Sequence, residues 1–378
     1  MHLCSNRLAV LTGLLFAASI WASPHAIAVA QMAAPTTAQK PAAEVQPPLD
    51  VDRDPVRSPD AAGTSPVTPP DSNAGSGDIT RSSSGGFTLR RDVDEVILNV
   101  TVLDDSNHLV NTLGKQDFTL SEDGVRQTIT SFQHEDIPVS MGMVVDNSGS
   151  MLHKRAGVNA AALDLVKASN PHDEAFIVNF SDEAFIDQDF TSDVNKLREG
   201  LSHIDSKGGT ALYDAVVASA DQLAKYGTRP KQVLLIITDG EDNASTLTLE
   251  QTIRRIQELQ GPIVYSIGLL FGDENSSREN RRAKRALQLL SSETGGVAYF
   301  PKSLNQVDEI ASEVARDIRN QYTLGYHSTK PASEGGYRLI HLEAKARGGG
   351  KLTVRTRTGY YPRGVKGAPV KTATGTGR

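Results

Sequence analysis

A polar segment that directly follows an apolar run carries the residue types best suited to chemistry. The run Met141–Val145 is continuously hydrophobic, and Asp146-Asn147-Ser148-Gly149-Ser150 comes next. This spacing places one carboxylate, of Asp146, and two hydroxyls, of Ser148 and Ser150, on a single loop. Hard oxygen ligands of this kind suit Mg²⁺ or Mn²⁺ better than zinc or copper. The segment therefore predicts a divalent-cation site.

Two later segments have the same chemical character. Gly208-Gly209-Thr210 comes just before a helical pattern, and Thr238-Asp239-Gly240 follows the apolar run Val233–Ile237. In a doubly wound sheet, ligands bind outside the carboxyl ends of the strands, so we expect the three loops to meet at one edge. The predicted metal ligands share small oxygen-bearing side chains: Asp146, Ser148, Ser150, Thr210 and Asp239. With only two carboxylates the ion keeps positive charge and an open position, which suits a carboxylate on a partner protein.

The elements that must position these loops alternate between strand and helix over residues 138–320. Strands are expected at Met141–Val145, Ala175–Phe180, Val233–Ile237, Ile263–Gly268 and Val297–Phe300. Helices are expected at Val158–Ala168, Ala211–Tyr226, Leu249–Leu259, Arg281–Leu290 and Val307–Asn320, with a polar loop before Ala211. This alternation predicts an α/β fold with a Rossmann-like, doubly wound, mostly parallel sheet.

The flanks of this region, residues 87–137 and 321–363, contain strand patterns without helices. They lie at Val93–Leu103, Phe118–Ser121, Gln127–Phe132, Gln321–Tyr326, Arg338–Ala346 and Leu352–Arg357. Closely spaced strands without helices indicate antiparallel pairing. We therefore predict that both flanks form one small antiparallel β domain, into which the α/β domain is inserted.

The two ends of the chain have a different character. Residues 1–30 carry one charge, Arg7, and an apolar run from Leu8 to Trp21 followed by Ala26-Ile27-Ala28, which predicts a signal peptide; an uncleaved anchor is the alternative. Residues 31–86, rich in Pro, Ala, Ser and Thr, and the tail 364–378 are expected to be disordered. We expect an exported protein, periplasmic or secreted, whose mature chain has no transmembrane span.

Composition and motifs exclude several other functions. The 378 residues include 39 Lys and Arg against 45 Asp and Glu, a net charge of −6 that gives no reason to expect nucleic-acid binding. The only cysteine, Cys4, lies in the predicted signal, which excludes thiol catalysis in the mature chain. No histidines have metal-ligand spacing, and Gly348-Gly349-Gly350-Lys351 lacks the Ser or Thr of a phosphate loop. The sequence indicates no base for Ser148 or Ser150, so we expect no enzyme activity.

Taken together, the three loops resemble the metal-ion-dependent adhesion site of von Willebrand factor A (VWA) domains, over roughly Pro138 to Asn320. The flanking segments resemble secreted VWA-related proteins of acidobacteria at Asp117-Phe118, Glu122-Asp123-Gly124, Gln321-Tyr322 and Thr358-Gly359-Tyr360. The resemblance implies a domain that binds protein ligands through the metal, usually without catalysis. It also implies that Ser148, Ser150 and Thr210 approach the ion directly or nearly so, while Asp146 and Asp239 often act through water or hydrogen bonds.

Three functional hypotheses remain at this point. The first is metal-dependent binding of a protein ligand that supplies a carboxylate. The second is a metal-dependent hydrolase that uses the same ion to activate water. The third is a structural module of the cell envelope with a vestigial site. Taken singly, Asp146–Ser150 has the alternative of an Asn-Ser-Gly turn that caps a helix, and Thr238-Asp239-Gly240 that of a simple turn.

Overall fold

The computed structural model describes residues 79–81, 87–89 and 95–363, except 168–169, 205, 272–276 and 347–348. These residues belong to one of the two units into which the chain divides, 49–378. The predicted signal peptide, the tail from residue 364 and the spacer lie outside them, except that β1 (Ile79–Arg81) pairs antiparallel with β2 (Phe87–Leu89). None of the helices in the described ranges has the length and apolar character needed to cross a membrane.

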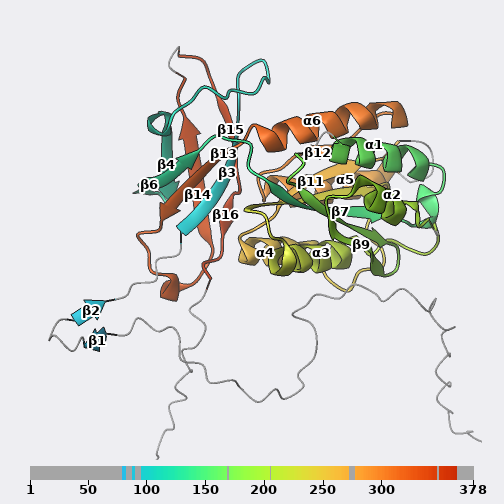
Figure 1. The fold of residues 1–378 in the computed structure, drawn as a ribbon, viewed down its shortest axis with the longest axis horizontal. Helices are drawn as coiled ribbons and strands as arrows, with labels where there is room; N and C mark the ends of the chain where they lie inside the picture. The colour runs from blue at the N-terminus through green and yellow to red at the C-terminus, as the bar shows by residue number, and fades with distance from the viewer. Residues whose placement is uncertain are drawn as a thin grey trace, which may run out of the picture. The chain divides into compact units, whose positions relative to one another are not determined.

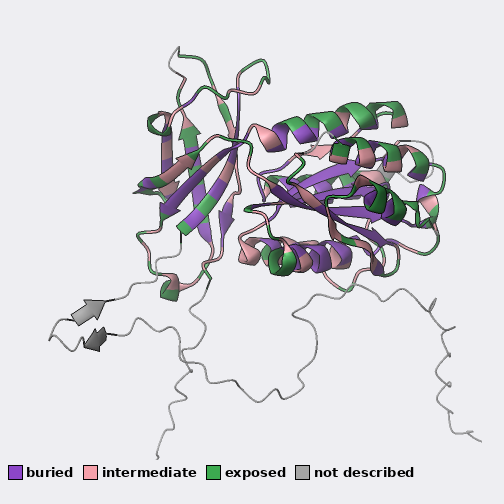
Figure 2. Ribbon diagram, in the orientation of Figure 1, coloured by how far each residue is buried: buried purple, intermediate pink, exposed green. Residues whose placement is uncertain are grey.

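A six-stranded sheet forms the centre of the α/β domain (Figure 1). Its order is β12 (Ala298–Tyr299), β11 (Ile263–Gly268), β10 (Lys231–Thr238), β7 (Val139–Asp146), β8 (Glu174–Phe180) and β9 (Ala184–Thr191). Every neighbouring pair is parallel except β8 and β9. Figure 2 shows the central strands almost wholly buried, which is why their sequences are continuous apolar runs.

Helices cover both faces of this sheet. One face packs against α1 (Arg155–Lys167), α2 (Val194–Ser202) and α6 (Val307–Arg319). The other packs against α3 (Leu212–Tyr226), α4 (Leu249–Leu259) and α5 (Ser277–Ser292). The predicted doubly wound, mostly parallel α/β fold is confirmed.

One expectation about this domain is wrong: the segment between Phe180 and Ala211 is not a simple polar loop. It contains the antiparallel edge strand β9 and the helix α2, which begins after the N-cap Asp193. β9 is mostly half-buried, and α2 buries only Leu197, Gly200 and Leu201. Neither element has the long apolar pattern that marks the central strands, so their sequence signal is weak.

The flanks form one antiparallel β domain, as predicted. Its first sheet has the order β15 (Thr353–Arg355), β3 (Glu95–Leu103), β13 (Tyr322–His327), β6 (Ile129–Gln133). The second has the order β16 (Gly359–Tyr360), β14 (Arg338–Ala344), β4 (Phe118–Glu122), β5 (Val125–Gln127). Both sheets contribute to one hydrophobic core. The expected strand Gln127–Phe132 is instead interrupted at Thr128, because β5 and β6 belong to different sheets.

The carboxyl end of α6 joins the two domains. Asp317 accepts hydrogen bonds from the hydroxyls of Thr101 on β3 (2.9 Å) and Tyr265 on β11 (2.9 Å), and it pairs with Arg355 on β15 (3.2 Å). Lys231, buried at the start of β10, donates to the carbonyl of Ile318 at 2.7 Å. Strands of both domains are therefore held to the same turn of one helix.

The burial of Lys231 predicts that the free energy of unfolding depends on pH. Burial lowers the pKa of Lys231 to about 8, although the charges of Asp136, Asp317 and Asp173 oppose this and that of Arg319 adds to it. Between about pH 8 and 10 this lysine binds more protons in the unfolded chain than in the folded protein, so its contribution to the free energy of unfolding rises with pH. Relative to Lys231→Met, the gain is expected to reach up to about 3 kcal/mol. Denaturant unfolding of both proteins across this range measures it; parallel profiles would contradict the prediction.

Candidate metal site

The loop after β7 is tied to the end of the neighbouring strand β10. Asp146, the last residue of β7, is fully buried. One of its carboxylate oxygens accepts the backbone N–H of Ser148 at 2.8 Å, and the other accepts the hydroxyl of Thr238 at 2.6 Å. Since Thr238 ends β10, Asp146 holds the ends of two parallel strands together and turns the chain toward the next two serines.

The hydroxyls of this loop meet the second carboxylate. The Oγ atoms of Ser148 and Ser150 lie 3.2 Å apart, and Ser150 donates to Oδ1 of Asp239 at 2.7 Å. Asp239 is fully buried and follows Thr238 directly. The structure thus brings together four of the five predicted residues through a continuous set of hydrogen bonds.

Thr210, the fifth residue, lies against the same turn. It is buried, and its backbone N–H donates to the side-chain oxygen of Asn243 at 2.9 Å. A β-carbon added to Gly240 would lie 3.6 Å from the Thr210 hydroxyl oxygen, which places this hydroxyl beside the residue that follows Asp239. All three loops therefore reach the same edge of the sheet.

Glycine is required beside Thr210. Gly208 has a φ of +84°, in the left-handed region that side chains rarely adopt. A β-carbon on Gly208 or Gly209 would approach Asp182 to 2.2 or 2.7 Å. Asp182 accepts the N–H of Gly209 at 2.6 Å, so the close approach is what fastens the loop that carries Thr210.

Two charged residues at this site, Asp182 and Lys154, are not among those expected from the sequence. Asp182 follows β8, and its position just after an apolar run was a usable signal. Lys154 lies just before α1, and its ammonium is 2.7 Å from Oδ2 of Asp239. A pairing between residues 85 positions apart leaves no mark in the local sequence pattern.

Burial dominates the electrostatics of the site. It raises the pKa of Asp146 to about 6, against the hydrogen bonds from Thr238 and Ser148, which favour the ionised form. Burial also lowers the pKa of Arg155 to about 10, although the charge of Asp146 opposes this. The Arg155 guanidinium donates to the side-chain oxygen of Asn179 at 2.7 Å. A desolvated carboxylate of this kind favours a cation.

The donor chemistry fits Mg²⁺ or Mn²⁺. Two carboxylates and three hydroxyls supply oxygen ligands alone, and two of the hydroxyls and one carboxylate are already in mutual contact. Within the described ranges, no three His, Cys, Asp or Glu side chains are grouped so that they could hold a metal ion. An ion at these loops would therefore depend on the serine and threonine hydroxyls as much as on Asp146 and Asp239.

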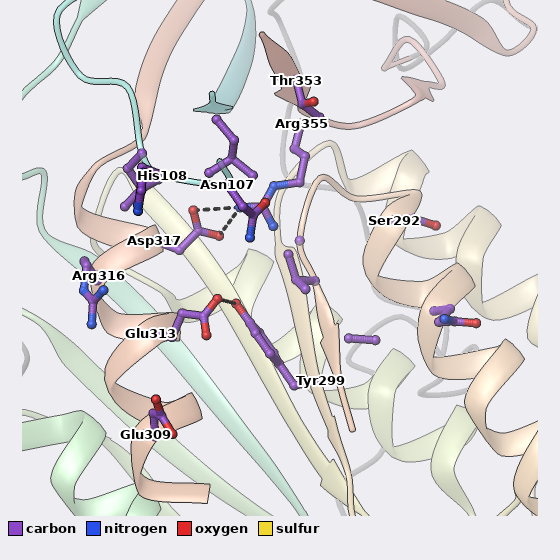
Figure 3. A pocket seen from close by; sticks show the side chains of 16 residues that line it. Asn107, His108, Ser292, Tyr299, Glu309, Glu313, Arg316, Asp317, Thr353 and Arg355 are labelled. Atoms are coloured by element: carbon purple, nitrogen blue, oxygen red, sulfur yellow. Dashed lines mark hydrogen bonds and ion pairs between the residues drawn. The ribbon is translucent and has the colours of Figure 1, made fainter. Parts of the chain in front are cut away.

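A separate pocket lies at the junction of the two domains, beside edge strand β12 (Figure 3). Its volume is about 880 Å³, and residues from the β3–β4 loop, α5, β12, α6 and β15 line it. Figure 3 shows the Asp317–Arg355 pair and the hydrogen bond from Tyr299 to Glu313 (3.3 Å) in its wall. None of the five predicted metal ligands lines this pocket.

Comparison with known proteins now identifies the domain. Residues 141–241 match the family model of the von Willebrand factor type A domain, and this range includes all five predicted ligands. The chain therefore carries a VWA domain. The match does not extend over the flanking strands, so their resemblance to acidobacterial proteins stays a prediction. None of the curated proteins matches the chain.

Several solved structures are similar at low identity. A von Willebrand factor type A protein from Catenulispora acidiphila has 12% identity and a TM-score of 0.43, over 71% of this chain and 75% of that one. The vWF domain of the type V pili tip protein Mfa5 from Porphyromonas gingivalis has 14% identity and a TM-score of 0.39, over 48% and 97%. The PilB minor pilin from Streptococcus sanguinis has 12% identity and a TM-score of 0.40, over 63% and 83%.

Proposed function

We propose that the VWA domain binds a protein ligand through Mg²⁺ or Mn²⁺ held by Asp146, Ser148, Ser150, Thr210 and Asp239. The contact of Ser148, Ser150 and Asp239 beside the buried Asp146 is the observation that carries the proposal. When bound, the ion supplies positive charge and an open position, which a carboxylate of the ligand fills. These side chains would hold the ion, and the buried carboxylates of Asp146 and Asp239 would supply its counter-charge.

Exposed apolar side chains on the neighbouring loops support the proposal that the site binds a protein and not merely an ion. Leu152, two residues after Ser150, is 55% exposed, and Ile204, in the loop after α2, is 41% exposed. A β-carbon on Gly149 would lie 3.9 Å from the carbonyl of Ser206, so the two loops are adjacent. Apolar contacts around a central polar anchor are typical of protein interfaces.

The site offers less to the hydrolase hypothesis. In the part of the chain that the structure describes, the hydroxyls of Ser148 and Ser150 bond to each other, that of Ser150 also donates to Asp239, and neither bonds to a histidine. A nucleophile needs an adjacent base of suitable pKa. Turnover of ester or phosphoester substrates that is lost in Asp146→Asn would nevertheless favour a hydrolase over a binding module.

We also propose that the protein acts outside the cytoplasm, in the periplasm or after secretion. The signal-like pattern of residues 1–30 supports this location. The spacer and the β domain would then separate the VWA domain from the N-terminus. Export of the full-length chain with loss of its first 30 or so residues, measured by mass spectrometry of the exported protein, tests this part of the proposal.

Calorimetric titration of chelator-stripped protein with Mg²⁺ and Mn²⁺ tests the metal site. We expect saturable binding of about one ion per chain. Ser150→Ala and Thr210→Ala should each weaken it, because each removes one oxygen ligand, whereas the exposed Ser312→Ala on α6 should not. Absence of saturable binding in the wild type would contradict the proposal and favour a structural module.

A further inference from the structure

Lys154 already places a positive charge in the proposed metal site. Its ammonium lies 2.7 Å from Oδ2 of Asp239, and the two side chains are only 8% and 0% exposed. The other oxygen of the same carboxylate accepts the hydroxyl of Ser150. Asp239 is therefore shared between a proposed metal ligand on one side and a buried lysine on the other.

We infer that Lys154 sets the affinity of this site for its ion: it acts as the counter-ion of Asp239 in the metal-free protein and weakens binding of a divalent cation. The inference rests on the proposed metal site and adds the way in which its affinity is regulated. Lys154 is a positioning residue, because it acts through Asp239.

The first part of the inference, that Lys154 is the counter-ion of Asp239, follows from the burial of this carboxylate. A fully buried carboxylate without a compensating charge is strongly destabilising. Lys154 supplies that charge, and it lies between the loop after β7 and the first turn of α1, where Val158 donates its N–H to the Lys154 carbonyl. Its ammonium also lies 5.9 Å from the centre of the Phe271 ring, so an aromatic face lies on another side of it. We therefore expect Lys154 to stabilise the arrangement of these loops when no ion is bound.

The second part of the inference, that Lys154 weakens binding of a divalent cation, follows from electrostatics. A divalent cation held by Ser148, Ser150 and Asp239 would share a poorly solvated site with the ammonium that pairs with Asp239. Two cations on one carboxylate repel each other, and the repulsion is large where water does not screen it. Removing the lysine charge should therefore tighten binding of Mg²⁺ by about tenfold or more.

Three variants separate the charge of Lys154 from its packing. Lys154→Gln keeps a hydrogen-bond donor toward Asp239 without the charge, and Lys154→Arg keeps the charge. Lys167→Gln is the matched control: it removes an exposed lysine from the last turn of α1, where Lys167 pairs with Asp164 at 2.8 Å. Each full-length variant is titrated with Mg²⁺, and its melting temperature is measured with and without the ion.

The expected results differ between the variants. Lys154→Gln should bind Mg²⁺ about tenfold or more tightly than the wild type. Its melting temperature without Mg²⁺ should be lower than that of the wild type, and the increase in melting temperature on adding Mg²⁺ should be larger. Lys154→Arg and Lys167→Gln should bind as the wild type does. A folded Lys154→Gln that binds equally or more weakly overturns the inference; if it does not fold, Lys154→Met refolded with Mg²⁺ replaces it.

The same titrations distinguish failure of the proposed metal site from failure of the inference on Lys154. If neither wild type nor Lys154→Gln binds an ion, both proposals are overturned. If only Lys154→Gln binds, the inference is supported and the wild-type site is too weak to act as proposed. If the wild type binds and Lys154→Gln is no tighter, the metal site stands and the role of Lys154 is rejected.

Discussion

Replacing Asp146 with asparagine is expected to abolish binding of Mg²⁺ while making the metal-free protein more stable. The carboxylate is one of only two at the site, so its loss removes half of the negative charge that attracts the ion. Asparagine keeps one oxygen to accept the N–H of Ser148, and its amide donates to Thr238 in place of accepting from it. We expect the affinity for Mg²⁺ to fall by at least a hundredfold.

The gain in stability has the same cause as the loss of binding. Burial raises the pKa of Asp146 to about 6, so the folded protein favours the neutral carboxyl. The stabilisation that comes from this preference is complete below the unfolded pKa, near 4, and is lost as the pH rises through about 6. At pH 7 the ionised group is therefore unfavourable, and its neutral replacement should raise the free energy of unfolding by about 1–3 kcal/mol.

Denaturant unfolding in chelator, beside calorimetric titration with Mg²⁺, measures both effects. Asp164→Asn is a matched control, because this α1 residue is about half exposed and lies away from the loop. We expect the control to change neither quantity appreciably. If Asp146→Asn binds Mg²⁺ like the wild type, Asp146 is not a ligand of the ion. If the variant is less stable than the wild type at pH 7, the folded protein does not disfavour the ionised carboxylate, and the prediction for stability is wrong.

Replacing Glu122 with alanine is expected to destabilise the β domain by about 3–5 kcal/mol. Glu122 and Arg338 form an ion pair at 3.4 Å with side chains that are each 1% exposed. The same carboxylate accepts the hydroxyls of Tyr326 (2.6 Å) and Tyr360 (2.9 Å). Its removal leaves a buried guanidinium without its counter-charge and two buried hydroxyls without their acceptor.

Thermal and denaturant unfolding of the full chain test this prediction. Glu343→Ala provides the control, because Glu343 is exposed on the neighbouring strand β14, where it lies 3.1 Å from the exposed His341. We expect it to change stability by less than about 0.5 kcal/mol. A Glu122→Ala protein as stable as this control would show that the network contributes little to the β domain.

The sequence best predicts the strands that are deeply buried in the fold. The core strands β7, β8 and β10 are buried on both faces, so their apolar runs are continuous and were recognised. Helix α4 has the predicted ends, and the structure shows a capping box of Thr248 and Gln251 at its start. The edge strand β9 was missed because it is only partly buried and so lacks such a pattern.

For the candidate site, the types of the candidate ligands and the strand ends on which they lie follow from the sequence alone. Asp146, Ser148 and Ser150 are close in sequence, and the carboxyl ends of parallel strands bring the loops of Thr210 and Asp239 to the same edge. The ion pair of Lys154 with Asp239 and the hydrogen bond by which Asp182 fastens the glycine loop become visible only in the folded structure. The same holds for Glu122 and Arg338, 216 residues apart. Such partners are chosen by the packing of whole elements, and local patterns of hydrophobicity and turn residues do not encode that packing.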